Sequence, residues 1–202
     1  MSDNRLLLAT NNKGKVREYK SLLRGIPYEI VTPAELGITV EVDEAGGSFE
    51  ENARLKATAL AAESGLLSLA DDSGLEVDAL GGEPGVLSAR YAGEGASDTE
   101  RIDYLLARLK DVSEEKRTAR FRCVIAIAAP DGRVEFCEGE CRGFITREPR
   151  GNNGFGYDPV FYLPELGKTM AELTLEEKNR VSHRARAAEK AREVLMKIAR
   201  ES

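Results

Sequence analysis

The sequence predicts an α/β fold organised around a mixed β-sheet with flanking helices. Apolar runs of strand length alternate with segments whose apolar residues recur at helical spacing, which is typical of α/β folds. One hairpin interrupts the alternation: residues 121–129 are the strongest strand signal, residues 130–132 (Pro-Asp-Gly) are a turn sequence, and residues 133–142 return antiparallel. Because no repeat, linker or low-complexity segment divides the chain, we expect one continuous domain over residues 1–202.

The composition excludes several classes of function. With 42% hydrophobic and 32% charged residues, the 202-residue chain is typical of a globular protein with a buried core. A net charge of −6 argues against general nucleic-acid binding, and no membrane span or signal peptide is evident. Cys123, Cys137 and Cys141 form no C-x-x-C pair, so we expect structural thiols in a reducing compartment. These features predict a cytoplasmic protein that binds neither nucleic acid nor membranes.

The first predicted unit is a strand, a polar loop and a helix. Residues 5–9 are apolar, residues 10–15 are polar, and residues 16–23 carry apolar side chains at helical spacing. A loop that leads into a helix presents free N–H groups and the positive end of the helix dipole, which suit a phosphate, and Lys13 and Lys15 add charge. The alternative is an ordinary capped helix with solvated lysines. The spacing of a Walker loop is absent.

A weak strand at residues 28–31 precedes an acidic loop and an alanine-rich helix. Ser48 and Glu51 have the spacing of a capping box that starts this helix. Asn52 and Lys56 lie four residues apart and therefore share one helix face. Lysines on such helices usually extend into solvent, so exposure of Lys56 is the alternative to a role in a site.

Residues 66–70 form a short apolar run that ends at Asp71-Asp72, followed by Ser73. We interpret the run as a buried strand with two carboxylates at its end, where α/β sheets place their sites. Adjacent Asp side chains repel each other, and a nearby divalent cation relieves that repulsion. The alternative is a polar turn, because Asp, Ser and Gly favour turns. Residues 75–80 then alternate as an exposed strand would.

Two further helices have clear start signals. Residues 97–100 form a capping box ahead of an apolar stripe at residues 102–109, with the i, i+3, i+4, i+7 spacing of a helix that packs on a core. Residues 174–177 form another capping box, ahead of a short helix that carries Lys178. The sequence therefore predicts helices at both places.

Three side chains of the C-terminal half are candidates for contact with a ligand. Phe155 lies between two glycines, where its ring could stack on a base or fold back into the core. His183 and Arg184 fall in the first turn of the last helix, where the helix dipole favours anions rather than cations. Their position is understandable if they face an anionic or carbonyl-bearing ligand, although a lone His is more often structural.

Five motifs in this order resemble those of the inosine/xanthosine triphosphate pyrophosphatases, enzymes that act on non-standard purine nucleotides. The resemblance extends over roughly residues 6 to 184, and an ordered set of five is far more specific than any single motif. The motifs lie at residues 8–15, at residues 48–53 with Lys56, at residues 70–75, at residues 154–159 and at residues 182–184.

The resemblance implies hydrolysis of ITP, dITP or XTP to the monophosphate and pyrophosphate, with Mg²⁺, by a homodimer. It implies a long mixed sheet with flanking helices in two lobes around a central cleft. By the same resemblance, Asp72 is the proton acceptor, and Glu44 and Asp72 bind the metal. Asp71 could tune Asp72 or support the metal. The substrate-binding residues implied are Thr10, Asn11, Asn12, Lys13, Gly14, Lys15, Lys56, Ser73, Phe155, Gly156, Tyr157, Asp158, Lys178, His183 and Arg184.

Two other functions stay open at this point. A related pyrophosphatase acting on pyrimidine or modified bases would have the same phosphate-binding groups. A non-catalytic nucleotide sensor is the second alternative. The paired Asp71 and Asp72 argue against the sensor, because a pure binder gains little from carboxylates beside a polyphosphate.

Overall fold

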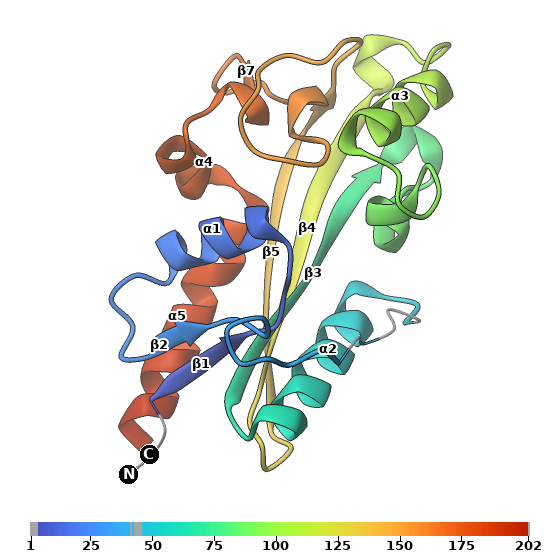
Figure 1. Ribbon diagram of the computed structural model, residues 1–202. Coiled ribbons are helices and arrows are strands. Elements are labelled where there is room, and N and C mark those ends of the chain that lie inside the picture. Colours follow the sequence, from blue (N-terminus) through green and yellow to red (C-terminus); the bar gives the residue numbers. More distant parts are fainter. Residues whose placement is uncertain (1–3, 41, 43–45, 202) are drawn as a thin grey trace. The chain divides into compact units, whose positions relative to one another are not determined.

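A computed structural model describes residues 4–40, 42 and 46–201 and confirms the α/β fold with a mixed sheet (Figure 1). The strands are β1 (Arg5–Leu8), β2 (Glu29–Val31), β3 (Leu67–Val77), β4 (Thr118–Ala128), β5 (Val134–Ile145), β6 (Phe161–Leu163) and β7 (Lys168–Thr169). The α-helices are α1 (Lys13–Leu22), α2 (Phe49–Ser64), α3 (Asp98–Arg108), α4 (Leu175–Val181) and α5 (His183–Glu201). Within the described residues the sheet order is β2-β1-β3-β4-β5-β6-β7. β1 pairs in parallel with β2 and β3, and β6 pairs antiparallel with β5 and β7.

The chain divides into two compact units, each assembled from segments that are distant in the sequence. Unit 1 comprises Met1–Asp72, Cys123–Gly139 and Arg184–Ser202. Unit 2 comprises Ser73–Arg122 and Glu140–His183. The chain passes from one unit to the other within β3, β4 and β5, and again at the start of α5. The predicted single domain and central cleft stay predictions.

Helices cover both faces of the sheet in unit 1 (Figure 1). Leu6 and Leu8 of β1 point to one face, where they are buried in a core cluster with Tyr19 of α1 and Ala187 of α5. Leu7 points to the opposite face and is equally buried, and α2 contacts β1. One face of the sheet therefore meets side chains from α1 and α5, and the other meets side chains from α2.

The core of unit 2 forms around the predicted apolar stripe of α3. Ile102, Leu105 and Leu109 are buried in one cluster with side chains of β3, β4 and β6, and Ser97 and Glu100 form the predicted capping box. Arg117 is also buried, and its guanidinium donates to the main-chain carbonyls at the end of α3 and at the end of β5. These bonds satisfy carbonyl groups that the end of a helix otherwise leaves without partners.

β3 corrects one prediction of the sequence analysis. It is a continuous strand of 11 residues, so Asp71 and Asp72 lie in its middle rather than at its end, and the polar-turn alternative is also wrong. Leu75 and Val77, predicted to belong to an exposed strand, are fully buried. Turn preferences of Asp and Ser operate when their side chains bond the local backbone. Here other elements supply their partners, so the extended backbone continues.

Two helix starts differ slightly from the prediction. α1 begins at Lys13, and the Asn12 side chain caps it by accepting from the Lys15 N–H at 3.1 Å, so the polar loop is shorter than expected. At α2 the Ser48 hydroxyl accepts from the Glu51 N–H, but the Glu51 carboxylate accepts from Gly47 instead of Ser48. That helix therefore has half of the predicted capping box.

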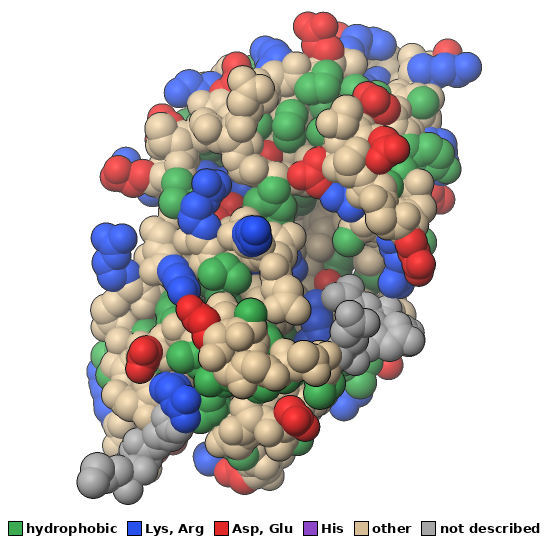
Figure 2. Space-filling view, viewed as in Figure 1, with side chains coloured by type: hydrophobic (Ala, Val, Ile, Leu, Met, Phe, Trp, Pro, Cys, Tyr) green, Lys and Arg blue, Asp and Glu red, His purple; other side chains and the backbone are tan. Residues whose placement is uncertain are grey.

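The surface agrees with the composition. Acidic and basic side chains are intermixed on the face seen in Figure 2. Among the helices of the described residues, none combines the length and apolarity that crossing a bilayer demands.

Candidate active site

The start of α1 presents backbone donors toward solvent. Thr10 orients the loop by accepting from the Asn12 N–H at 3.1 Å, and Asn11, Asn12 and Lys13 are exposed. The first turn of α1 contains no acidic residue. Free N–H groups at a helix N-terminus attract anions, so this end of α1 has the properties of a phosphate-binding site.

Beside this helix start, the edge of β3 becomes free because β1 is short. The last main-chain bond between these strands joins Ala9 N–H to the Leu69 carbonyl at 2.8 Å. The next carbonyl on the same edge is that of Asp71. It accepts from the ammonium of Lys56 at 3.0 Å and from that of Lys15 at 3.4 Å. Two lysines from different helices thus replace the missing strand partner.

The Asp71 carboxylate is buried among cations. It lies 2.9 Å from the Lys15 ammonium and accepts from the Arg184 guanidinium at 3.2 and 3.3 Å. Burial raises the pKa of Asp71, but the charges of Lys15, Arg184 and Lys56 outweigh it and hold the pKa well below its usual range. The carboxylate of Asp71 is therefore ionised at neutral pH.

A buried ion pair lies behind Asp71. The Arg184 guanidinium donates to Glu18 of α1 at 2.7 Å, and both side chains are at most 2% exposed. Cys123 of β4 contacts Asp71 at 3.7 Å, and burial followed by the charge of Asp71 raises the pKa of this thiol to about 12. Cys123 is thus a neutral core side chain, which agrees with the structural role expected for it.

Asp72 points to the other face of the strand and meets α2. Its carboxylate accepts from the Asn52 amide at 3.0 Å and lies 3.6 Å from the Lys56 ammonium. Asn52 is fixed as a donor, because its own oxygen accepts from the Gly46 N–H at 2.8 Å. Lys56 is 13% exposed, so the alternative of a solvated lysine is wrong. The two adjacent carboxylates therefore have separate surroundings.

Asp72 provides a carboxylate oxygen, which is the ligand type that Mg²⁺ prefers. In Asp71, by contrast, one oxygen contacts Lys15 and the other contacts Arg184. Glu44, the second predicted metal ligand, lies outside the described residues. In the described ranges 4–40, 42 and 46–201, no group of three or more His, Cys, Asp or Glu side chains could hold a metal ion. The donor chemistry of Asp72 fits magnesium, and a complete ligand set needs further groups.

In unit 2, residues 151–158 form a loop that is held from inside. The buried Asp158 carboxylate accepts from the Phe155 N–H at 3.0 Å and from the Lys178 ammonium at 2.5 Å. Gly154 has a φ of +75°, and a Cβ there would lie 2.0 Å from the Asp158 carboxylate. Only glycine fits this position.

Phe155 is half-buried and outside the core cluster of unit 2. The Lys178 ammonium lies 4.9 Å from the centre of its ring, within the range of a cation–π contact. The Gly156 N–H donates to Asp98 at 2.7 Å, and the Tyr157 hydroxyl donates to the Ser88 carbonyl at 2.9 Å. The ring of Phe155 is thus presented by a loop with several fixed points.

Known proteins resemble this chain over nearly its full length. The Ham1 family profile matches residues 6–194, which is nearly the whole chain. The chain belongs to the Ham1 family. A relative from Desulforamulus reducens named dITP/XTP pyrophosphatase is 54% identical over 96% of both chains. One of the same name from Bacillus subtilis is 49% identical over 94% of this chain and 96% of the other. The solved structure of a HAM1 protein from Coxiella burnetii has a TM-score of 0.87 and 43% identity, and covers 98% of this chain and all of that one.

In this Ham1 protein, unit 1 brings together the predicted phosphate and metal residues that the structure describes. The start of α1, Lys15, Lys56 and Asp72 surround the free edge of β3. Unit 2 brings together Phe155, Asp158 and Lys178. Ser73, at the start of the unit 2 part of β3, is half-buried.

His183 and Arg184 do not share one environment in this structure. His183 is 4% exposed and stacks on Phe121 of unit 2, with ring centres 4.6 Å apart. Arg184 is 1% exposed and binds carboxylates of unit 1. Contact of either side chain with a base stays a prediction.

Several residues that contact the predicted site residues were missed by the sequence analysis. Asn52 had a signal, since it shares a helix face with Lys56. Glu18 lies three residues after Lys15 on α1, but a glutamate on a helix is ordinarily solvated. Ser88 and Asp98 are distant in sequence from the loop they hold, so no local pattern could identify them.

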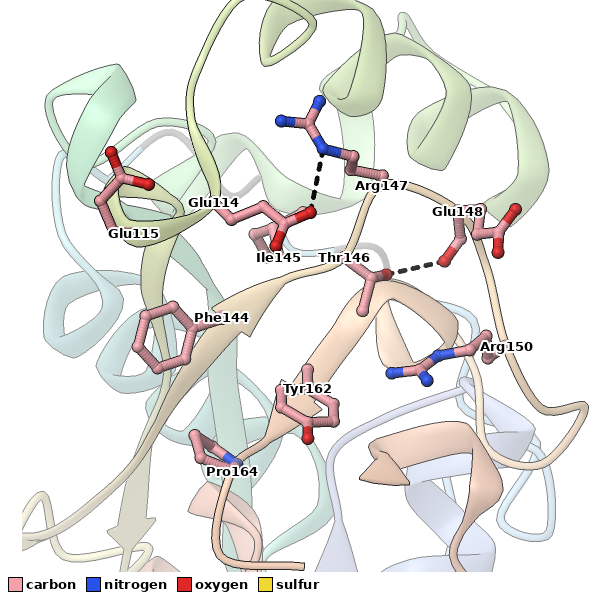
Figure 3. Close-up of a pocket in the computed structure, with 10 residues that line it drawn as sticks. All are labelled: Glu114, Glu115, Phe144, Ile145, Thr146, Arg147, Glu148, Arg150, Tyr162 and Pro164. Carbon is pink, nitrogen blue, oxygen red and sulfur yellow. Dashed lines mark hydrogen bonds and ion pairs between the residues drawn. The ribbon is translucent and has the colours of Figure 1, made fainter. Parts of the chain in front are cut away.

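A separate hollow of about 730 Å³ lies in unit 2 (Figure 3). Phe144 and Tyr162, paired across β5 and β6, contribute aromatic side chains, and the Arg150 guanidinium lies over the Tyr162 ring at 5.3 Å. None of the predicted site residues is among those that line it. This hollow is therefore lined by a different set of residues from the predicted site.

Proposed function

We propose that this Ham1 protein hydrolyses triphosphates of non-standard purine nucleosides, namely ITP, dITP and XTP, to the monophosphate and pyrophosphate. The observation that carries this proposal is the free edge of β3, where Lys15 from the first turn of α1 and Lys56 of α2 both contact the Asp71 carbonyl, and Lys56 also lies 3.6 Å from the Asp72 carboxylate. A polyphosphate needs such cationic groups, and hydrolysis needs a base. Relatives about 50% identical over nearly the full chain are named dITP/XTP pyrophosphatase.

The phosphate chain is proposed to bind along the start of α1. A triphosphate carries about four negative charges, and backbone N–H groups with lysine ammoniums neutralise such charge. Lys15 and Lys56 are only 15% and 13% exposed, so their charges are weakly screened by water. With the β and γ phosphates held there, pyrophosphate becomes a good leaving group. The residues proposed for this task are Thr10, Asn11, Asn12, Lys13, Gly14, Lys15 and Lys56.

Asp72 is proposed to accept the proton of the attacking water. Asn52 and Lys56 contact its carboxylate and hold it in a fixed orientation. A positioned carboxylate of this kind orients the water for attack at the α-phosphorus. Glu44 and Asp72 would hold Mg²⁺, which supplies neutralisation of the charge that develops on the phosphate oxygens.

The loop of unit 2 is proposed to hold the nucleoside. Phe155 would stack on the base, since its ring is half-buried and lies on a fixed loop. Stacking adds affinity for any purine without distinguishing between them. Ser73, Gly156, Tyr157, Asp158, Lys178, His183 and Arg184 complete the proposed contacts. We also propose that the protein is a cytoplasmic homodimer.

The test is release of pyrophosphate by the purified protein with Mg²⁺, with ITP, dITP, XTP, ATP, GTP, UTP and TTP as substrates. Preference for ITP, dITP and XTP by kcat/KM is expected. Preference for UTP or TTP would support the pyrimidine alternative, and binding without turnover would support the nucleotide sensor. Light scattering on the eluted protein measures the oligomeric state, and a monomer would contradict the proposed dimer.

A further inference from the structure

Ion pairs link four side chains of alternating charge in the order Lys15, Asp71, Arg184 and Glu18. Asp71 lies 2.9 Å from Lys15 and 3.2 Å from Arg184, and Arg184 lies 2.7 Å from Glu18. The two ends of this series, Lys15 and Glu18, lie three residues apart on one face of α1. The side chains of Asp71, Arg184 and Glu18 are at most 2% exposed, whereas that of Lys15 is 15% exposed. Of these four side chains, that of Lys15 is therefore the most accessible to a ligand.

The main chain of the same residue contacts a second ammonium. The Asp71 carbonyl accepts from Lys56 at 3.0 Å and from Lys15 at 3.4 Å. Lys15 comes from α1 and Lys56 from α2, and these helices pack on opposite faces of the sheet (Figure 1). The two like charges therefore meet at the strand edge with the carbonyl dipole of Asp71 between them, and its carboxylate adds negative charge on the α1 side.

We propose that Asp71 is a positioning residue that holds Lys15 and Lys56 together as a ready-made polyphosphate clamp, with the Glu18–Arg184 pair fixing its carboxylate in place. This inference rests on the proposed function only for the class of ligand, a polyphosphate. Two lysines brought close repel each other and lose side-chain freedom, and both costs reduce affinity unless they are offset before the ligand binds. Asp71 offsets both the repulsion between the lysines and their loss of side-chain freedom. Asp72 then remains available as the proposed general base.

The experiment is a calorimetric titration of the full chain with inorganic pyrophosphate, with orthophosphate as the matched ligand and a chelator present. Asp71→Asn is expected to weaken pyrophosphate binding by about tenfold or more, the effect typical of losing a charge-assisted hydrogen bond, and to change orthophosphate binding much less. In a double-mutant cycle, Asp71→Asn should add less than about twofold to the loss that Lys15→Gln already causes, because the two residues act through one contact.

Three controls separate positioning from other roles. Cys123→Ala removes a neutral contact of the same carboxylate and should leave pyrophosphate affinity unchanged. A metal-ligand role for Asp71 predicts instead a higher Mg²⁺ concentration for half-maximal turnover. A purely structural role predicts equal weakening of both phosphate ligands, or full additivity of Asp71→Asn and Lys15→Gln. Any of these last three results overturns the proposal.

The design keeps the two proposals distinguishable. If Asp71→Asn and Lys15→Gln are coupled in pyrophosphate binding but the protein hydrolyses no nucleotide, the proposed function is refuted and the role of Asp71 is supported. If the protein hydrolyses nucleotides but the two substitutions are not coupled, the proposed function is supported and the role of Asp71 is refuted. If Asp71→Asn fails to fold, the Glu18→Gln variant provides the test, because it should shift Arg184 toward Asp71. Pyrophosphate binding should then weaken by about two- to threefold, as expected for partial loss of a charged contact. Unchanged affinity would refute the positioning role of Asp71.

Discussion

Replacing Asp72 by Asn is the change that best separates catalysis from folding. The side chains of Asp and Asn have nearly the same shape. Asp72 is 6% exposed in the middle of β3, so the substitution should not disturb the residues packed around it. The contacts of its carboxylate include those with Asn52 at 3.0 Å and Lys56 at 3.6 Å. An amide can still accept from either partner, so the fold should persist, but it cannot take a proton from water.

The expected magnitude follows from that lost proton transfer. Removing a general base costs about 10²–10⁴ in rate, equivalent to about 3–5 kcal/mol of barrier. Pyrophosphate release from ITP, measured with saturating substrate, gives kcat directly. Asp78→Asn is the matched control, because Asp78 follows the same strand and its carboxylate contacts Thr118 rather than a lysine. Thermal unfolding of both variants separates loss of activity from loss of fold.

A refuting result is readily defined. Turnover by the folded Asp72→Asn variant within about threefold of the parent enzyme would show that Asp72 is not the base, given the loss typical of that role. A comparable loss in Asp78→Asn would show that the assay reports a general effect of charge. If turnover falls and returns with added Mg²⁺, the role of Asp72 is metal binding alone.

Four further predictions follow from the contacts around the two units. Lys13→Ala and Lys56→Ala should weaken triphosphate binding more than monophosphate binding in a titration, and equal weakening would contradict the assignment. Turnover should disappear in excess chelator and return with Mg²⁺, since Asp72 offers a hard oxygen ligand. Arg184→Ala should destabilise the protein by about 3–5 kcal/mol in denaturant unfolding, because it removes the guanidinium shared by buried Glu18 and Asp71. An unchanged midpoint of unfolding would contradict this prediction. In the same variant, the ITP-to-ATP ratio of kcat/KM tests the proposed contact of Arg184 with the purine base. Burial raises the pKa of Cys123 to about 12 and that of Cys137 to about 11, so both thiols stay protonated at about pH 9, where an unfolded thiol is largely ionised. Alkylation of the native chain at that pH would contradict their burial. The stability that the two thiols contribute should fall as the pH rises toward these pKa values.

The fold was largely predictable from local patterns. The strand at residues 5–9, the hairpin after residue 129 and the apolar stripe of α3 each follow from spacing that depends on neighbours in sequence. β3 was the exception, because its polar centre resembles a turn in isolation. It stays extended because it pairs with β1 and β4, and its polar centre is contacted by Lys15, Lys56 and Arg184, which come from three different helices. No local pattern contains that information.

The candidate site was predictable only in part, for the same physical reason. Motif spacing identified the lysines and the carboxylates, but it could not separate the environments of Asp71 and Asp72. Glu18 was missed because its partner Arg184 is 166 positions away in the sequence. A buried charge is identified by its partner, so it becomes visible only when the fold brings the two together.

The alternation of a β-strand explains how two neighbouring aspartates can have different tasks. Consecutive side chains point to opposite faces, so Asp71 meets α1 and α5 while Asp72 meets α2. The same alternation leaves every second carbonyl on one edge, and the early end of β1 exposes that of Asp71. A single residue step along β3 thus separates a carboxylate that is neutralised by cations from one that is held by an amide and a lysine. A polar turn at this point, which was the alternative in the sequence analysis, would not have kept the two aspartates apart on opposite faces.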